Sequence, residues 1–256
     1  HMKKLENILI TGITGLIGGI AFNDLKKDYQ ITGLSQSKMD SVNHFQANVD
    51  NLEGIMPAFQ GQDAVIHLAA DANDTASWKS TLPNNIIGTY NVYEAARQND
   101  VKRIIFASSN HTTGMFENDH PYHHIVKGEY NQVTHPIQHI GHTSEVRPDG
   151  YYGVSKAYGE NMGRYYSEQY GISVIALRIG TCNAHNQPKN MRHFATWLSH
   201  RDQAQLVRKS LQAPETLKFD IFYGVSRNKW RFWDIEHARN VIGYDPEDNA
   251  ENYRNK

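Results

Sequence analysis

A tyrosine and a lysine stand four residues apart in the segment YGVSK, as Tyr152 and Lys156. On a helix this spacing places both side chains on one face. A free phenol has a pKa of about 10 and is a poor base near neutral pH, but a nearby ammonium group stabilises the phenolate. We therefore expect Tyr152 to act as a base in a redox reaction and Lys156 to activate it. An ordinary surface pair is the alternative.

Two serines at a strand end favour the catalytic interpretation. The segment FASSN ends an apolar run with Ser108 and Ser109. In open parallel sheets, ligands bind at the carboxyl ends of the strands. The hydroxyl of Ser109 can therefore hold a substrate oxygen beside Tyr152.

A glycine-rich segment, TGITGLIG, follows the apolar run 8–10 near the start of the chain. Gly12 permits a tight turn, Gly15 lets the backbone approach a pyrophosphate, and Gly18 lets the next helix pack on the strand. The free N–H groups and positive dipole end of that helix suit phosphates. The pattern predicts a dinucleotide site, although a plain strand-to-helix turn is an alternative use of such glycines.

The end of the second expected strand bears on the choice between NAD and NADP. A carboxylate there would bind the ribose 2′-hydroxyl of NAD. This chain has Ser35 instead, with Lys38 close by and no carboxylate before Asp40. Hydroxyl groups and a cation suit a 2′-phosphate, so we expect NADP or NAD, with NADP favoured. A solvated Lys38 beside a loose ribose site is the alternative.

These motifs need a scaffold in which strands and helices alternate. The expected strands are 7–10, 29–34, 64–68, 103–107 and 174–177. The expected helices are 16–27, 85–98 and 152–170. This alternation is typical of βαβ units in a parallel α/β sheet with helices on both faces. Two irregular stretches, the polar 116–149 and the mixed 183–256, interrupt it, and we expect them to lie together over one edge of the sheet, on the substrate side.

Composition sets further limits. The 256 residues suffice for one large or two modest domains, and a net charge of −1 gives no basic surplus for nucleic acid or a membrane surface. The single Cys182 excludes an internal disulfide, and no apolar run reaches the roughly 18 residues of a membrane span. With no secretory pattern, we expect a cytoplasmic protein without nucleic-acid or membrane partners.

Several histidines gather in the stretch 116–149. They are His120, His123, His124, His135, His139 and His142. No Cys and no cluster of Asp or Glu with ligand spacing accompanies them, and tyrosine-based hydride chemistry needs no metal. We expect a solvated lid there and no metal site.

Together, TGITGLIG, DAVIHLAA, NIIGTYNVYEAAR, FASSN and YGVSK resemble the extended short-chain dehydrogenase/reductase superfamily. Within it, IIFASSNHTTG, RPDGYYGVSK, LRIGTC and ATWLSHRD are similar to bacterial uronate dehydrogenases. The resemblance implies a Rossmann fold, a doubly wound parallel sheet. Residues 3–180 would bind the dinucleotide, with a lid-like insertion at about 116–149. Residues 181–256 would form a small C-terminal substrate-binding subdomain.

The resemblance also implies an activity, the oxidation of the C1 hydroxyl of a small sugar acid to a lactone, with hydride passing to the nicotinamide. The implied catalytic residues are Ser109, Tyr152 and Lys156. The implied substrate ligands are Ser109, Asn110, His111, Thr181 and Arg192. The implied cofactor contacts are Gly12, Thr14, Gly15, Leu16, Ile17, Gly18, Ser35, Lys38, Asn48, Val49, Leu68, Ala69, Ala70, Asn85, Tyr152, Lys156 and Ile179. Arg192 would clamp the substrate carboxylate with its planar fork, and a structural ion pair is its alternative role.

The chain departs from the family pattern. Ser35 replaces an expected acidic residue, Ala72 replaces an expected serine, and the segment between His111 and Arg147 is longer and richer in histidine. The chain also ends soon after residues 244–254, without the expected tail. These departures leave the cofactor and the sugar open.

Other functions on the same fold remain as alternatives. A sugar-phosphate dehydrogenase acting on glucose 6-phosphate is one. A nucleotide-sugar epimerase or dehydratase would want a larger C-terminal domain than the 75 residues that follow Thr181. A non-catalytic NADP sensor would have no reason to keep Ser109, Tyr152 and Lys156 together. By analogy with the superfamily, the helix around 85–97 suggests a homodimer or a higher homo-oligomer.

Overall fold

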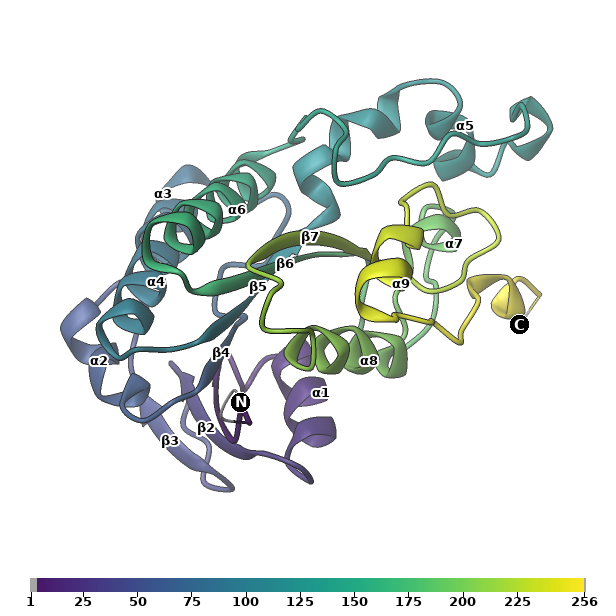
Figure 1. Cartoon of the computed structure of the whole chain (residues 1–256). Helices are drawn as coiled ribbons and strands as arrows, with labels where there is room; N and C mark the ends of the chain where they lie inside the picture. The colour runs from purple at the N-terminus through teal and green to yellow at the C-terminus, as the bar shows by residue number, and fades with distance from the viewer. Residues whose placement is uncertain (1–3, 256) are drawn as a thin grey trace.

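The computed structural model describes residues 4–255. Within this range seven strands form one sheet in the order β3-β2-β1-β4-β5-β6-β7, and every neighbouring pair is parallel. The strands are β1 (Asn7–Thr11), β2 (Gln30–Ser35), β3 (Asn43–Gln46), β4 (Ala64–His67), β5 (Arg103–Ser109), β6 (Ser173–Ile179) and β7 (Phe219–Gly224). The expected doubly wound parallel α/β sheet is confirmed (Figure 1).

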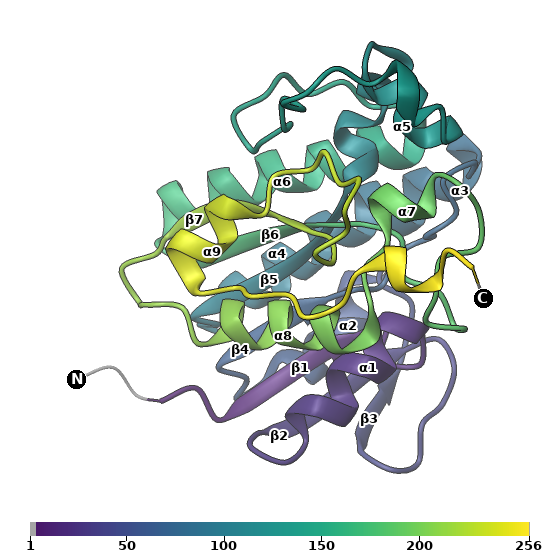
Figure 2. The ribbon, with the colours of Figure 1, turned by 90° about the vertical axis from the view of Figure 1, so that its right-hand side faces the viewer.

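Helices cover both faces of the sheet. One face carries α1 (Leu16–Leu25), α8 (His200–Leu211) and α9 (Glu236–Ile242). The other carries α2 (Leu52–Phe59), α4 (Gly88–Gln98) and α6 (Tyr151–Tyr170). Figure 2 shows the strands between α6 on one side and α8 on the other. No helix in the described part of the chain is both long enough and apolar enough to cross a bilayer.

Short elements fill the connections. They are α3 (Trp78–Thr81), the π-helical turn η1 (Leu82–Ile87), the 3₁₀ segments η2 (Asn110–Asn118), η3 (Tyr130–Gln132) and η4 (Ala250–Tyr253), α5 (Tyr122–Lys127) and α7 (His193–Thr196).

The apolar sequence of the strands explains the two-layered core. Successive side chains of a strand point to opposite faces of the sheet. In β1, Ile8 and Ile10 therefore join the core under α1 and α8, whereas Leu9 joins the core under α2 and α4. Strands buried on both faces need continuous apolar runs. This is why the motif-bearing strands stood out in the sequence.

The structure adds elements that the sequence pattern did not predict. The edge strand β3 has the polar sequence NHFQ and is only part-buried, so it lacks an apolar signal. Strand β7 lies in the stretch expected to be irregular, beyond the predicted domain boundary at residue 180. The dinucleotide-binding sheet thus takes its last strand from the predicted substrate region. The boundary itself stays a prediction, and its first residue, 3, lies outside the described residues.

The two irregular stretches, 116–149 and 183–256, pack together, as expected. Ile140 pairs with Trp233 in a short parallel bridge, and Tyr130 stacks on Trp230 with ring centroids 4.0 Å apart. Figure 1 shows the segment around α5 on the same side of the molecule as α7 and the C-terminus. The segment 116–149 therefore packs against the C-terminal region that follows β7.

Candidate active site

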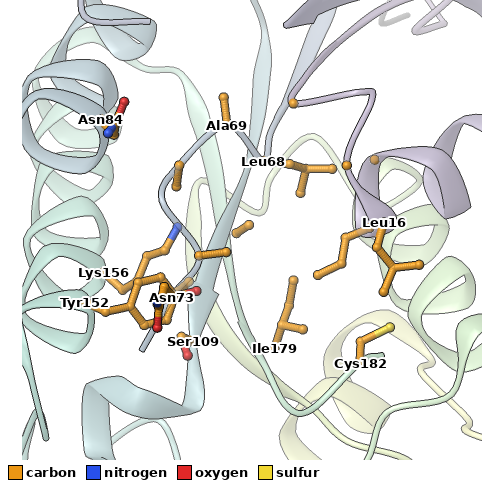
Figure 3. Close-up of a pocket in the computed structure, with 18 of the residues that line it drawn as sticks. Leu16, Leu68, Ala69, Asn73, Asn84, Ser109, Tyr152, Lys156, Ile179 and Cys182 are labelled. Carbon is orange, nitrogen blue, oxygen red and sulfur yellow. The ribbon is translucent and has the colours of Figure 1, made fainter. Parts of the chain in front are cut away.

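A cavity of about 670 Å³ opens at the carboxyl ends of β1, β2, β4, β5 and β6. Its walls come from the glycine-rich turn on one side and from α6 on the other (Figure 3). The sequence-predicted residues that line it are Gly12, Thr14, Gly15, Leu16, Ile17, Gly18, Ser35, Val49, Leu68, Ala69, Ala70, Ser109, Asn110, His111, Tyr152, Lys156, Ile179, Thr181 and Arg192.

Three predicted cofactor residues, Lys38, Asn48 and Asn85, lie outside this lining. The ammonium group of Lys38 is 2.9 Å from Asp40, and the Lys38 side chain is 72% exposed. Asn85 is buried, and its amide donates to Ser155 Oγ at 3.1 Å. Lys38 is therefore exposed to solvent. Asn85 lies outside the cavity lining, where it bonds to Ser155 of α6. Their roles as cofactor contacts stay predictions.

The glycine-rich turn needs glycine at two positions. Gly12 has a φ of +69°, and a Cβ there would lie 2.8 Å from the backbone nitrogen of Ala69. A Cβ on Gly18 would lie 2.3 Å from the carbonyl oxygen of Gly12. The turn therefore brings β1, β4 and the start of α1 closer together than any side chain would permit.

The N-terminus of α1 is built to receive an anion. Its N-cap, Gly15, has no side chain to cap the helix, and its first turn contains no acidic residue. Leu16, Ile17 and Gly18 of that turn line the cavity. Because the first N–H groups of a helix have no partners within it and lie at its positive dipole end, they suit a pyrophosphate. The residues present therefore fit a dinucleotide.

The end of β2 forms the part of the cavity where an adenosine ribose would lie. Ser35 is buried, and its Oγ lies 2.8 Å from the carbonyl oxygen of Ser37 and 2.7 Å from Nε2 of His44. Gln36 and Ser37 complete this part of the lining. Among the described lining residues no carboxylate stands at this strand end, as the sequence indicated.

The helix α6 brings Tyr152 and Lys156 into the cavity wall. Lys156 is buried, with its Nζ 5.5 Å from the centroid of the Tyr152 ring and 5.2 Å from that of Phe106. Burial lowers the pKa of Lys156 to about 8, because the charged ammonium loses water that the low-dielectric wall does not replace. The predicted Tyr/Lys face is therefore directed inward, as Figure 3 shows.

The phenol of Tyr152 is hard to ionise in the chain without a cofactor. Burial raises the pKa of Tyr152 to about 12, although a hydrogen bond with Ser109 acts in the opposite direction. In the chain without a cofactor, burial thus outweighs the hydrogen bond with Ser109. A second positive charge in the cavity is needed to make the phenolate accessible.

Ser109 and Asn110 form a polar wall beside Tyr152. The Oγ of Ser109 accepts a hydrogen bond from the backbone N–H of His111 at 3.1 Å and donates to Oδ1 of Asn110 at 3.3 Å. The buried Nδ2 of Asn110 has no hydrogen-bond partner among residues 4–255. Since a buried donor without a partner is costly, Asn110 is suited to a polar ligand.

His111 is oriented by a carboxylate that sequence reasoning missed. Its Nδ1 lies 2.8 Å from Oδ2 of Asp149, and its ring meets the ring of Tyr152 edge-on at 5.8 Å. Asp149 stands in the segment RPDG just before α6. Its position two residues before the helix that carries Tyr152 was the available signal.

Arg192 approaches Thr181 but also has a partner that the sequence did not indicate. Its Nη1 donates to Oγ1 of Thr181 at 3.3 Å. Its Nε and Nη2 donate to the two carboxylate oxygens of Glu117 at 2.6 and 3.0 Å. The guanidinium of Arg192 thus forms the structural ion pair, and the same nitrogens would be needed to bind a substrate anion. No sequence motif around Glu117 pointed to this pair.

The doubly wound sheet, the glycine-rich turn and the inward Tyr/Lys pair define the class of extended short-chain dehydrogenases/reductases. A family model gives a more specific assignment. The chain belongs to the NAD dependent epimerase/dehydratase family, whose model matches residues 8–216.

Several known sugar dehydrogenases are similar to this chain over nearly its whole length. The chain is 35% identical to a uronate dehydrogenase of Pseudomonas putida, over 97% of this chain and 87% of that one. It is also 35% identical to an NAD-dependent glucose-6-phosphate dehydrogenase of Haloferax volcanii, over 96% and 94%. The crystal structure of uronate dehydrogenase from Agrobacterium tumefaciens superposes with a TM-score of 0.82 at 32% identity, covering 98% of this chain and 88% of that one.

Proposed function

We propose that this chain oxidises the C1 hydroxyl of a hexuronate to the lactone, with NAD or NADP as the oxidant. The observation that carries the proposal is the meeting of Ser109, Tyr152 and Lys156 on one wall of a cavity whose other end is the open N-terminus of α1. The uronate dehydrogenases among the relatives, similar over nearly the full chain, support the substrate class.

The substrate hydroxyl is held by Ser109 and Tyr152. Ser109 is buried at the end of β5, and its hydrogen bond with Tyr152 places the two oxygens around one point. A C1 hydroxyl at that point would lie within reach of both side chains. The neighbouring Nδ2 of Asn110 offers a donor to a ring or hydroxyl oxygen. The reacting carbon is thereby oriented before any bond changes.

Tyr152 acts as the general base. Its phenolate accepts the proton of the C1 hydroxyl as the carbonyl of the lactone forms. A dinucleotide held at the glycine-rich turn and the N-terminus of α1 would supply the hydride acceptor and, in its oxidised form, a positive charge. Lys156 adds a second positive charge beside the phenol and shares in stabilising the phenolate. Because burial alone raises the pKa of Tyr152, the base needs both charges to work near neutral pH.

Arg192 and Thr181 lie at the part of the cavity that would receive the sugar carboxylate. A planar guanidinium binds a carboxylate in a bidentate manner. Glu117 occupies that fork in the present structure. A hexuronate would therefore replace Glu117 or share the guanidinium with it.

A second candidate substrate is glucose 6-phosphate, which also carries an oxidisable C1 hydroxyl and a remote anion. The Haloferax volcanii relative supports it at the same identity as the uronate dehydrogenase. Both substrates would use the same base, and each would present a different anion to Arg192.

The experiment is a substrate survey with NAD and with NADP, followed by the absorbance of the reduced nicotinamide. We expect turnover with galacturonate or glucuronate, and little with glucose 6-phosphate. Tyr152→Phe should lower kcat by about 10²-fold or more and leave the affinity for the cofactor unchanged. Full activity in Tyr152→Phe would exclude the catalytic assignment, and no turnover with any sugar would favour the epimerase or sensor alternatives.

We also expect a cytoplasmic homodimer or higher homo-oligomer. The outer surfaces of η1, α4 and α6 expose large apolar side chains, among them Ile87, Tyr90, Val154 and Tyr165. If α4 and α6 packed against α4 and α6 of a second copy, this apolar surface would be buried. Light scattering on the purified chain tests it, since a monomeric mass would exclude this contact.

A further inference from the structure

Three histidines of the segment 116–149 converge at the start of α5, away from the catalytic cavity. The ring centroids of His123 and His124 are 3.8 Å apart, and His120 lies 6.0 and 5.5 Å from them. One nitrogen of each imidazole lies within 4.8 Å of the others. The segment is visible around α5 in Figure 1.

The turn into α5 produces this convergence among the histidines of the segment HPYHH. His123 and His124 are adjacent in the first turn of α5, and His120 stands two residues before the helix, so the turn into α5 brings its ring close to both of theirs. The other face of α5 is anchored, because Ile125 is fully buried and the hydroxyl of the buried Tyr122 donates to the carbonyl of Gln138 at 2.6 Å. Packing of α5 thus holds the three imidazoles together at the surface.

A carboxylate orients one of the three rings from outside. Nδ1 of His124 lies 2.6 Å from Oε2 of Glu129. This contact leaves Nε2 of His124 for a ligand, the arrangement in which metal-binding histidines are commonly held. The Nδ1 of His123 is buried and has no hydrogen-bond partner among residues 4–255. A polar atom in that state is suited to a ligand.

We propose that His120, His123 and His124 bind one divalent transition-metal ion of the Zn²⁺ type. Neutral imidazoles suit Zn²⁺, Ni²⁺ and Cu²⁺, whereas Mg²⁺ and Ca²⁺ prefer oxygen. With metal–nitrogen bonds of about 2.0–2.1 Å, tetrahedral geometry puts ligand nitrogens about 3.4 Å apart, so small side-chain rotations would close the site. Water or an added ligand completes the coordination.

The sequence alone pointed away from a metal here because no Cys or carboxylate has ligand spacing around these histidines. Three imidazoles need no further protein ligand when a coordination position stays open. The decisive facts are the fold of α5 and the position of Glu129, which the motif HPYHH does not reveal.

A second group of potential ligands, His142, Asp220 and His237, is less suited to a metal. The rings of His142 and His237 stack with an interplanar angle of 10° and centroids 3.7 Å apart, so their planes do not converge on one point. Nε2 of His237 is already 2.7 Å from Oδ1 of Asp220. This group is satisfied as a packing contact between the lid and the sheet.

The test is a titration of the chelator-treated 256-residue chain with Zn²⁺ by calorimetry and with Co²⁺ by visible absorption. We expect one site that is lost in His123→Gln and in His124→Gln. Glu129→Gln should weaken it by about 10-fold or more, because the orienting carboxylate is gone. The control is His135→Gln, a histidine of the same segment outside the cluster, which should bind like the unchanged chain.

Three results would overturn the proposal. They are no binding by the unchanged chain, equal binding by the cluster variants, and loss of binding in His237→Gln with retention in His124→Gln. Thermal unfolding separates binding from misfolding, since Zn²⁺ should raise the Tm of the unchanged chain and of His135→Gln. It should leave the Tm of a folded His124→Gln variant where it was.

Discussion

Arg192 and Glu117 form a two-pronged ion pair at the sugar end of the cavity. Nε and Nη2 of Arg192 lie 2.6 and 3.0 Å from the two carboxylate oxygens of Glu117. The Glu117 side chain is only 13% exposed, so the pair is poorly screened by water. A substrate carboxylate would seek the same guanidinium nitrogens. If Arg192 binds the substrate as proposed, Glu117 would compete with an anionic substrate for its guanidinium.

This competition predicts the effect of Glu117→Gln. The neutral amide keeps the shape of the side chain and removes its charge, so the guanidinium becomes available. We expect the KM for a hexuronate to fall by about tenfold with kcat nearly unchanged, because charged hydrogen bonds contribute roughly 1.5–3 kcal/mol. Steady-state kinetics measure this. Arg192→Ala should move KM in the opposite direction.

A rise of KM in Glu117→Gln would contradict this expectation, since it would mean that Glu117 holds Arg192 in place for the substrate. A neutral aldose is the matched control. Its KM should be the same in both chains because it carries no anion for Arg192.

Removing the buried ammonium group should stabilise the fold while stopping turnover. Burial lowers the folded-state pKa of Lys156 to about 8, against 10.5 for an ordinary lysine. Between these values the unfolded chain binds more protons, so the free energy of unfolding rises with pH across that window. Below it the full cost of burying the charge, about 3 kcal/mol, weighs on the fold. Lys156→Met removes that cost.

Urea unfolding of the cofactor-free chain tests this prediction. At pH 7, Lys156→Met should be the more stable chain, and the difference should shrink as the pH rises above about 8. The exposed Lys79 provides the control, because Lys79→Met buries no charge in either state. Equal stability of Lys156→Met and the unchanged chain at pH 7 would show that the ammonium is well solvated.

A substitution just after β2 tests whether the chain prefers NADP to NAD. Lys38 is exposed and pairs with Asp40 outside the cavity lining, but it is the cation that the sequence offered for a 2′-phosphate. Lys38→Ala should weaken NADP several-fold, as expected for one exposed ion pair, and leave NAD unchanged. Cofactor titrations decide it, with Lys27→Ala near the opposite end of α1 as the control. An equal loss for both cofactors would remove the reason for preferring NADP.

The sequence predicted the part of the fold that depends on local signals. β4 and β5 are buried on both faces, and their central residues therefore form short apolar runs, 64–66 and 104–107. The glycines of the first turn indicated that two backbone segments lie close together there, which a residue with a Cβ would prevent. Strand β3, an edge strand with the sequence NHFQ, gives no such signal.

The missing parts of the site depend on long-range contacts. Glu117 and Arg192 stand 75 residues apart, and neither belongs to a motif that specifies the other. The raised pKa of Tyr152 follows from burial that spacing cannot reveal. Sequence reasoning therefore predicted residues that the fold brings to one cavity, but not the ion pairs and the burial around them.

The helix that carries Tyr152 is held to the sheet by a buried ion pair. Arg178 on β6 donates to both carboxylate oxygens of Glu160 on α6 at 2.8 Å, and the Oγ of Ser108 donates to the same carboxylate at 2.6 Å. The side chains of Arg178 and Glu160 are 1% and 5% exposed. Removing one partner of such a pair leaves a buried, uncompensated charge.

Arg178→Met should therefore lower the free energy of unfolding by about 3–5 kcal/mol. The double variant Arg178→Met with Glu160→Gln should recover much of this loss, because no charge then remains buried. Urea unfolding of the single and double variants measures both values. Arg164→Met on the exposed face of α6 is the control, since its ion pair with Glu168 lies in solvent and contributes at most about 0.5 kcal/mol. A single variant as stable as this control would mean that Glu160 becomes protonated or hydrated at little cost, and that α6 is positioned by apolar packing alone.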